Sequence, residues 1–199
     1  MTDDSTRTIS LTAADGIVLA ADLALAATPR AAAVLCHPHP AYGGDRHNIV
    51  VDALFRVLPA AGIAALRFDF RGAGEGGQDD VLTALDRLAG DVPGVPLWLV
   101  GYSFGADVAL GVDDARLAGW VAVAPPLHFG TPPAPAGGDP RPALVLVPEH
   151  DAYSPPERTW AATEDWPTVT VEVVPMADHF LAGAAEGVAA TVTAWLSQR

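Results

Sequence analysis

The chain has 199 residues, half of them hydrophobic, and a formal net charge of -13. This length suits one domain with a full core and is short for two, so we expect a single domain over residues 1–199. The negative charge and the lack of a basic run argue against a nucleic-acid partner. The single cysteine excludes an internal disulfide and a thiolate zinc cluster.

The first ten residues, MTDDSTRTIS, are acidic and lack the charged-then-apolar pattern of a secretory leader. The longest apolar stretch, residues 17–36, is interrupted by Asp22, Pro29 and Arg30, which argues against a membrane span. From these two features we expect a soluble, cytoplasmic protein without a membrane partner.

The chain opens with two short runs of strand character. Residues 8–13 and 17–25 flank Asp15-Gly16, a dipeptide that suits a turn between paired strands, so they predict a hairpin. After Pro29, short apolar runs alternate with longer segments of helical character. The runs predicted as strands are residues 31–36, 63–70, 96–103, 120–126, 143–151 and 169–175. The segments predicted as helices are residues 47–62, 78–90, 104–112 and 155–166.

Two later segments differ from this alternation. Residues 128–140, HFGTPPAPAGGDP, are rich in proline and glycine and have no helical period, so they predict an ordered loop rather than a helix or a lid. Residues 179–199 carry apolar side chains on one helical face and predict a C-terminal helix that packs on the core. The side chains on that face are Leu181, Ala184, Val188, Val192 and Trp195.

Near-continuous apolar strands separated by helices indicate an α/β fold. Right-handed crossovers place helices on both faces of such a sheet, so we expect a mostly parallel central sheet that follows an antiparallel opening hairpin. No insertion is long enough to form a cap domain. Cys36 ends the apolar run 31–36 and is expected to be a small buried hydrophobe.

The strongest chemical signal is the stretch LWLVGYSFGAD. Gly101-Tyr102-Ser103-Phe104-Gly105 fits the pattern Gly-x-Ser-x-Gly between a predicted strand and a predicted helix, which is the context of a nucleophile elbow. In such an elbow the serine sits on a sharp turn with strained dihedrals, and the two glycines avoid clashes with neighbouring strands. Ser103 is therefore the predicted nucleophile.

A serine hydroxyl needs a positioned base, and the base needs an orienting acid. His179 follows the last predicted strand, where a loop at the carboxyl end would present an imidazole to the shared crevice. Asp151 closes the strand 143–151 at the same edge and is the predicted acid, with Glu149 as the alternative. Asp178 adjoins the base itself, has little reach to its ring, and is expected to form a turn. The order Ser, Asp, His matches one known solution to triad geometry.

At these residues the chain resembles the α/β-hydrolase family, from the opening hairpin to the final helix. It is most similar to small lidless bacterial serine hydrolases with a His-Pro-His-Pro…Gly-Gly segment and an Arg-Phe-Asn-Phe-Arg-Gly segment, here CHPHPAYGGDRHN and RFDFRGAGEGG. Asp69 replaces the expected asparagine, and the serine that usually follows RGxG is missing. The resemblance implies that Ser103, Asp151 and His179 are nucleophile, acid and base. We expect no cofactor.

The elbow implies a serine hydrolase that cleaves ester-like acyl bonds of small or medium substrates through an acyl-enzyme. Peptidase, thioesterase and lactonase activities use the same groups and are not separated by the sequence. Apolar or aromatic residues next to the predicted catalytic loops are candidates for the walls of an open substrate pocket. They are Tyr42, Phe104, Leu127, Tyr153 and Phe180.

An oxyanion hole needs two backbone donors. One is expected at Phe104, and in this fold the other comes from the loop after an early central strand. Pro38 and Pro40 have no N–H, so His39 is the donor between them, with Ala41 or Tyr42 as alternatives. In this reading His37 anchors the loop through a hydrogen bond.

Three alternatives remain open. Residues 72–77 fit Gly-x-Gly-x-x-Gly, but they follow a later strand, carry Glu75 near the expected pyrophosphate, and precede a strand without a terminal acid for ribose. Arg67 and Arg71 beside this stretch are expected to form structural ion pairs, with Asp69 as a candidate partner.

The second alternative is a metal-assisted hydrolase, because His37 and His39 share one face of an extended segment, and Asp45 or His47 could complete a set. The prolines after both histidines and the need for a further ligand count against it. The third is a non-catalytic binding module on the same fold, since fold does not fix function.

Overall fold

The computed structural model describes residues 6–72, 76–127 and 135–199. They form one sheet with the strand order β1-β2-β4-β3-β5-β6-β7-β8. The strands are β1 (Thr6–Thr12), β2 (Val18–Ala24), β3 (Ala31–Cys36), β4 (Ile63–Phe68), β5 (Leu97–Tyr102), β6 (Leu117–Val123), β7 (Ala143–Pro148) and β8 (Val169–Val174). The neighbouring strands β4, β3, β5, β6, β7 and β8 all run parallel, whereas β2 is antiparallel to both β1 and β4.

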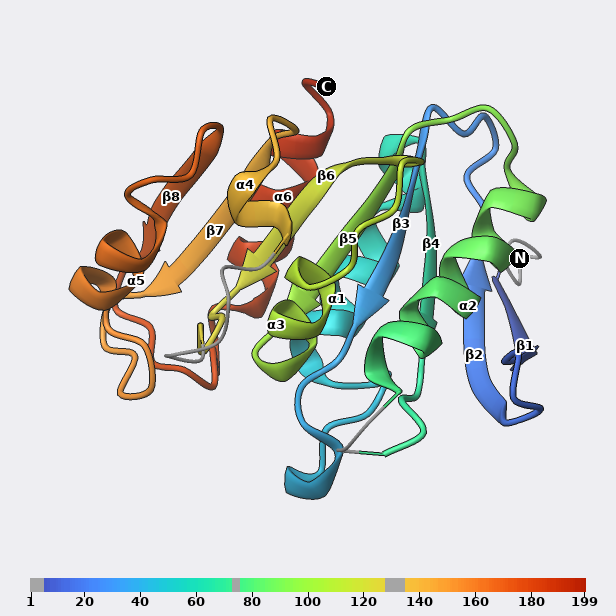
Figure 1. The fold of residues 1–199 in the computed structure, drawn as a ribbon, viewed down its shortest axis with the longest axis horizontal. Coiled ribbons are helices and arrows are strands. Elements are labelled where there is room, and N and C mark those ends of the chain that lie inside the picture. The colour runs from blue at the N-terminus through green and yellow to red at the C-terminus, as the bar shows by residue number, and fades with distance from the viewer. Residues whose placement is uncertain (1–5, 73–75, 128–134) are drawn as a thin grey trace.

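Helices cover both faces of the sheet, with α2, α3 and α4 on one side and α1 and α6 on the other (Figure 1). The helices are α1 (Ile49–Val57), α2 (Gly77–Asp91), α3 (Phe104–Leu110), α4 (Pro135–Gly138), α5 (Pro156–Thr163) and α6 (Ala185–Leu196), with short 3-10 turns η1 (Pro40–Tyr42) and η2 (Pro59–Ala61). This architecture confirms the predicted fold class.

The two core layers follow from the alternation of side chains along buried strands. Every residue of β3 is buried, as expected for a parallel strand covered on both faces. Val34 and Cys36 face the helices α2 and α3, whereas Ala33 and Leu35 face α1 and α6. Cys36 is fully buried, as predicted, and burial raises the pKa of its thiol.

Helix ends differ from the sequence expectation in three places. The helix predicted over 47–62 ends at Val57 and gives way to η2, because Pro59 lacks the backbone N–H that would continue the helical hydrogen bonds beyond Leu58. The C-terminal helix begins at Ala185 rather than near His179, after a turn in which Leu181 has φ +55°. Residues 135–138, predicted as loop, form the short helix α4, and residues 128–134 lie outside the described part of the chain.

A network of ion pairs joins β2, β4 and the loop after β3. Asp22 is paired with Arg67 across the β2–β4 ladder, and its Oδ2 accepts from Arg67 Nε at 3.0 Å and from Arg46 Nε at 3.1 Å. Asp69 bonds the backbone N–H of Arg46 at 2.9 Å and also its guanidinium. The expectation that Asp69 pairs with Arg67 or Arg71 is therefore wrong. The guanidinium of Arg67 instead lies over the ring of Phe55 and pairs with Asp52 of α1 at 2.8 Å.

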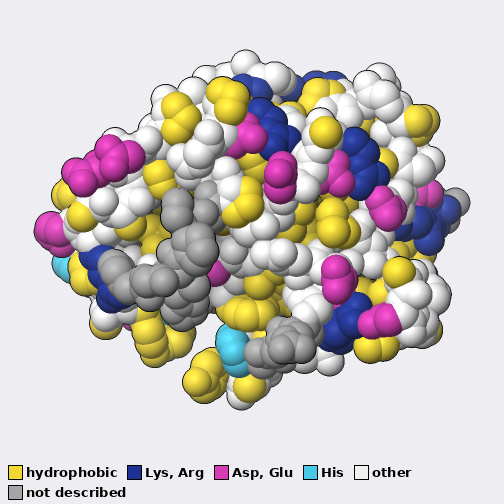
Figure 2. All heavy atoms as spheres, viewed as in Figure 1, with side chains coloured by type: hydrophobic (Ala, Val, Ile, Leu, Met, Phe, Trp, Pro, Cys, Tyr) yellow, Lys and Arg dark blue, Asp and Glu magenta, His cyan; other side chains and the backbone are white. Residues whose placement is uncertain are grey.

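Further ion pairs lie on the surface of the molecule. Figure 2 shows basic side chains next to acidic ones on the face that carries α2. Arg71 pairs with the fully buried Asp80 at 2.6 Å and also with Asp15, which ties α2 to the turn after β1. Within the described ranges, no helix is long and apolar enough to cross a membrane.

Candidate active site

The candidate residues follow the carboxyl ends of three parallel strands, and these ends all lie on the same side of the molecule (Figure 1). Ser103 directly follows β5, Asp151 lies just beyond β7, and His179 lies between β8 and α6. Because β5, β7 and β8 run in the same direction, their exit loops bring together residues that are far apart in the sequence.

Ser103 occupies the turn between β5 and α3 with φ 53° and ψ -121°, a region that residues with a side chain rarely adopt. The flanking glycines allow this turn to pack closely. A Cβ on Gly101 would lie 2.3 Å from the carbonyl oxygen of Gly105, and one on Gly105 would lie 2.4 Å from the carbonyl oxygen of Cys36. The backbone N–H of Ser103 donates to Val123 at 2.9 Å, which fixes the turn against β6.

The three side chains form a continuous hydrogen-bonded chain. Ser103 Oγ lies 2.9 Å from Nε2 of His179, and Nδ1 of His179 lies 2.8 Å from Oδ2 of Asp151. When Nδ1 carries the proton and donates it to the carboxylate, Nε2 has a lone pair directed at the serine hydroxyl. His179 can therefore accept the proton of Ser103 at Nε2 and then donate it to another group bound at the site.

Asp151 is held as a carboxylate. Burial opposes its ionisation, but hydrogen bonds from His179 and from the backbone N–H groups of Ser154 and Tyr153 outweigh this effect and lower its pKa. The two backbone bonds reach Oδ1 at 3.0 and 2.8 Å, so Oδ2 is left for the imidazole.

The two other acids considered from the sequence, Glu149 and Asp178, accept hydrogen bonds from backbone N–H groups instead of from His179. Glu149 accepts a hydrogen bond from the backbone N–H of Met176 at 2.7 Å in an exposed position. Asp178 accepts from the backbone N–H of Phe180 at 3.0 Å and shapes the turn that carries His179.

Tyr102 is a contributor that sequence reasoning missed. Its hydroxyl donates to the backbone carbonyl of His179 at 2.8 Å, which ties the loop after β8 to the central strand β5. Burial and the nearby carboxylate of Asp151 raise the pKa of Tyr102, so it stays a hydrogen-bond donor. A tyrosine before the elbow serine is the only signal in the sequence, and it does not reveal a partner so distant along the chain.

The loop after β3 packs against the elbow. His39 lies at the start of η1, and its ring meets the ring of Phe104 at 4.9 Å with an interplanar angle of 70°. Its Nδ1 accepts from the backbone N–H of Ala41 at 3.2 Å, and its carbonyl oxygen accepts from the N–H of Tyr42 at 3.0 Å. Ala41 and Tyr42, the alternative oxyanion donors, thus have their amides occupied. Within the described ranges, no hydrogen bond from the His39 N–H is found.

His37 is an anchor between two segments. Its Nε2 accepts from the backbone N–H of Phe70 at 3.0 Å, and its Nδ1 lies 2.6 Å from the carbonyl oxygen of Pro38. Burial lowers the pKa of His37 and favours the neutral ring. Both ring nitrogens are therefore engaged in protein hydrogen bonds. Among the residues with described positions, no group of three potential metal ligands comes together.

Among the solved structures with the same architecture are an α/β serine hydrolase and a serine hydrolase homologue. An α/β serine hydrolase homologue from Coxiella burnetii superposes with a TM-score of 0.85 at 26% identity, over 98% of both chains. An α/β serine hydrolase without a lid from Xanthomonas campestris also gives 0.85, at 24% identity over 100% of this chain and 96% of that one. The chain has the lidless α/β-hydrolase fold. The resemblance predicted from the sequence is confirmed at this level.

Comparisons of the sequence give less information than the comparison of structures. An uncharacterized protein from Rickettsia prowazekii is 34% identical over 108 residues, which are 48% of this chain and 45% of that protein. The match thus spans less than half of the relative's length. No protein-family model matches the chain.

On this α/β-hydrolase fold, exposed aromatic side chains flank the hydrogen-bonded residues. Tyr153 is 57% exposed, and its ring centroid lies 4.5 Å from that of His179. Phe180, also exposed, lies 5.8 Å from the same imidazole. Tyr42 packs on His39 at 4.8 Å. These contacts bring three of the predicted pocket residues close to the candidate catalytic groups.

Leu127 has a more buried place. Its backbone N–H donates to Asp107 at 3.1 Å, and its side chain packs against the core layer that contains α2 and α3.

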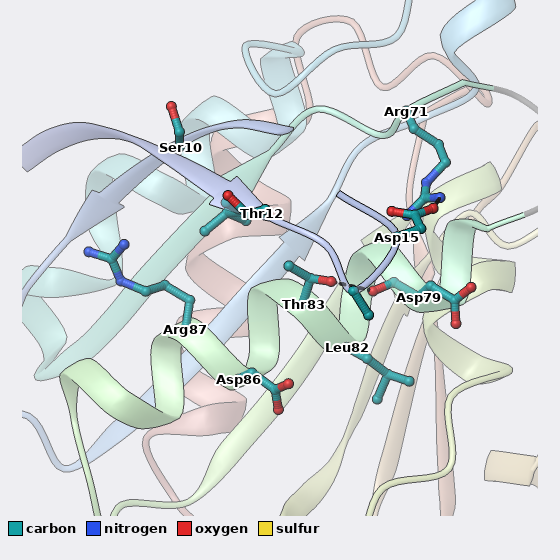
Figure 3. Close-up of a pocket in the computed structure, with 11 residues that line it drawn as sticks. Ser10, Thr12, Asp15, Arg71, Asp79, Leu82, Thr83, Asp86 and Arg87 are labelled. Atoms are coloured by element: carbon teal, nitrogen blue, oxygen red, sulfur yellow. Dashed lines mark hydrogen bonds and ion pairs between the residues drawn. The ribbon is translucent and has the colours of Figure 1, made fainter. Parts of the chain in front are cut away.

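Two cavities of the α/β-hydrolase fold lie away from Ser103. One, of about 720 Å³, lies between β1 and α2 and is lined by hydroxyls, acids and the arginines Arg71 and Arg87 (Figure 3). The other, of about 750 Å³, lies beside α1 and includes Phe55 and Arg67. Their arginines already pair with acids, as with Arg87 and Asp91 at 2.7 Å, so neither cavity offers a free cation from these residues.

Proposed function

We propose that the protein is a serine hydrolase that cleaves ester-like acyl bonds through an acyl-enzyme. The observation that carries the proposal is the chain of hydrogen bonds from Ser103 to His179 and on to Asp151, at 2.9 and 2.8 Å. The strained backbone of Ser103 adds support, because such strain persists at sites where a side chain must be presented in one direction.

In the proposed reaction, Ser103 Oγ attacks the carbonyl carbon while its proton passes to Nε2 of His179. Asp151 keeps the imidazole in the required tautomer and stabilises the imidazolium that forms. The tetrahedral intermediate collapses, the alcohol leaves with the proton of His179, and an acyl-Ser103 ester remains. Water then gives a proton to His179 and attacks the acyl carbon, and as the bond to Ser103 Oγ breaks, His179 returns this proton to the serine and the acid is released.

The developing oxyanion needs two backbone donors, and we assign these to Phe104 and His39. Phe104 begins α3, so its N–H has no acceptor within the helix. His39 has an N–H with no hydrogen bond found within the described ranges, in contrast to Ala41 and Tyr42. Loss of one such donor typically costs a factor of about 10²–10³ in kcat.

The proposed substrates are small or medium neutral esters. Tyr42, Tyr153 and Phe180 offer exposed aromatic surface beside the reacting groups, which favours an apolar acyl or alcohol part. The net charge of -13 disfavours the approach of anionic substrates over long range.

A fluorophosphonate probe and a series of activated esters of increasing acyl length test the proposal. The wild-type protein should be labelled at Ser103 and should hydrolyse the esters, and Ser103→Ala should lose both properties while it keeps its thermal stability. Labelling that persists in Ser103→Ala would refute the assignment. Hydrolysis that survives this substitution and disappears with a chelator would favour the metal-assisted alternative at His37 and His39.

A further inference from the structure

The peptide unit between Pro38 and His39 carries one of the two proposed oxyanion donors. No cis peptide bond occurs in the described ranges, so this unit is trans. In a trans peptide the C=O of one residue and the N–H of the next point in opposite directions. Whatever holds the carbonyl oxygen of Pro38 therefore also fixes the direction of the His39 N–H.

The side chain of His37 holds that oxygen from one side. Its Nε2 accepts from the N–H of Phe70 at 3.0 Å, so Nε2 bears a lone pair and Nδ1 bears the proton. Nδ1 then donates to the Pro38 oxygen at 2.6 Å. The ring is only 1% exposed and packs edge-on against Phe70 at 4.9 Å, which leaves it no freedom to turn.

Gly44 closes the other side of the same carbonyl. A Cβ on Gly44 would lie 2.1 Å from the Pro38 oxygen, so the glycine backbone lies directly beside it. The N–H of Gly44 also donates to the carbonyl oxygen of His39 at 3.1 Å. The Pro38 carbonyl is thus enclosed between an imidazole donor and the backbone of the returning loop.

We infer that His37 is a positioning residue of the oxyanion hole: its Nδ1–H fixes the Pro38–His39 peptide so that the His39 N–H faces the reacting carbonyl. The backbone N–H of Phe70, at the end of the segment after β4, sets the tautomer that makes this possible. The inference rests on the proposed function, because it concerns the donor that the proposed reaction needs.

Two conservative substitutions separate the two bonds of His37. Asparagine places its amide where Nδ1 lies, so His37→Asn can still donate to Pro38 but leaves the Phe70 N–H without an acceptor. Glutamine reaches the place of Nε2, so His37→Gln can accept from Phe70 but leaves the Pro38 carbonyl without its donor. Each variant loses one buried bond, so both should lose thermal stability to a similar extent.

The catalytic effect should differ between them. On an activated acetate ester, His37→Asn should keep kcat within about tenfold of wild type, whereas His37→Gln should lose a factor of about 10²–10³ with a much smaller change in KM. A purely structural role of His37 predicts equal losses of kcat that follow stability. Equal kcat values, or a higher value for His37→Gln, would overturn the inference.

A second pair of variants decides the question if neither His37 variant folds. Gly44→Ala should push against the Pro38 oxygen and lower kcat at least tenfold, and an unchanged kcat would refute the inference. Gly187→Ala, on α6 with open space around the added methyl group, is the matched control and should keep wild-type kcat. Fluorophosphonate labelling of wild-type Ser103 tests the proposed function separately from the role of His37. If Ser103 is not labelled, the proposed function is refuted; if it is labelled, the variants test only the role of His37.

Discussion

Asp22→Asn isolates the charge at the centre of the ion-pair network. Oδ1 of Asp22 accepts from the Thr8 hydroxyl at 2.9 Å, and Oδ2 accepts from both Arg67 and Arg46. In the variant, the amide oxygen can keep both guanidinium bonds, and the hydroxyl of Thr8 can turn to accept from the amide nitrogen. The hydrogen bonds are thus preserved in number, but all three lose the carboxylate as acceptor, and only the two from the arginines keep a charged partner.

The expected cost follows from this count. A hydrogen bond to a charged group contributes about 1.5–3 kcal/mol and a neutral one about 0.5–1.5 kcal/mol, so the bond with Thr8, which becomes neutral, loses about 1 kcal/mol. The two bonds from arginine keep a charged donor and lose only the attraction between opposite charges, about 0.5 kcal/mol each. Arg46 and Arg67 retain Asp69 and Asp52 as partners, so we expect a total loss of about 2 kcal/mol in the free energy of unfolding at pH 7. For a chain of this size that corresponds to a decrease in Tm of about 4–8 °C.

The effect should depend on pH with a defined sign. Burial opposes ionisation of Asp22, but the bonds from Thr8, Arg67 and Arg46 outweigh it and lower its pKa below 3.8. A carboxylate with a lowered folded-state pKa stabilises the fold above its unfolded pKa, and this contribution is lost as the pH falls through the folded value. The difference between wild type and variant should therefore be the same at pH 7 and 5 and should shrink by pH 3.

Urea denaturation of wild type and Asp22→Asn at these three pH values is the assay. Asp165→Asn, which alters an exposed acid, is the control and should change the free energy of unfolding by less than about 0.5 kcal/mol. A similarly small change for Asp22→Asn at pH 7, or a difference that persists unchanged at pH 3, would refute the reasoning.

Further substitutions at three residues address the proposed site. Asp151→Asn should keep the fold and lower kcat by about 10⁴, since the asparagine favours the wrong tautomer of His179; a loss below tenfold would shift the role of acid toward Glu149. His39→Pro removes the proposed donor together with the imidazole, at a residue whose φ of -57° suits proline, whereas His39→Ala removes the imidazole and keeps the N–H; kcat should fall by about 10²–10³ in the first and stay within tenfold in the second, and similar values for the two would exclude this donor. Tyr102→Phe leaves the carbonyl of His179 without its buried donor and should cost about 1–3 kcal/mol of unfolding free energy; unchanged thermal denaturation would show that the bond contributes nothing.

The sequence predicted those features that local pattern determines. Apolar runs between helical segments identified the parallel strands because such strands are buried on both faces, as in the fully buried β3. The glycines around Ser103 marked the elbow because a Cβ at either position would collide with backbone. Strand direction alone placed Asp151 and His179 at the same edge as Ser103, and the structure brings all three within hydrogen-bond distance. Their catalytic roles stay predictions.

Features that depend on distant partners were not predictable in this way. The bond between Tyr102 and His179 joins residues 77 positions apart, and no local pattern marks it. Asp69 pairs with Arg46 because the loop after β3 returns to the sheet, which neighbouring residues do not reveal. The start of α6 was also misplaced, because the apolar period continues through Leu181 although this residue has left-handed dihedrals outside the helix.

Because β8 lies at the edge of the sheet, the segment that carries the proposed base should be locally less stable than the segment that carries the nucleophile. Ser103 follows the central strand β5, whose residues are all buried, whereas His179 follows β8, an edge strand without a fully buried residue. Edge elements with little burial open at a lower free energy than the core around them. Opening of β8 alone would carry the imidazole away from the serine while the centre of the sheet stays folded. On heating, activity should therefore disappear reversibly at a temperature below that of the cooperative transition followed by far-UV circular dichroism. The difference between these two temperatures should depend on the Tyr102 hydroxyl, because its hydrogen bond ties the loop that carries His179 to β5.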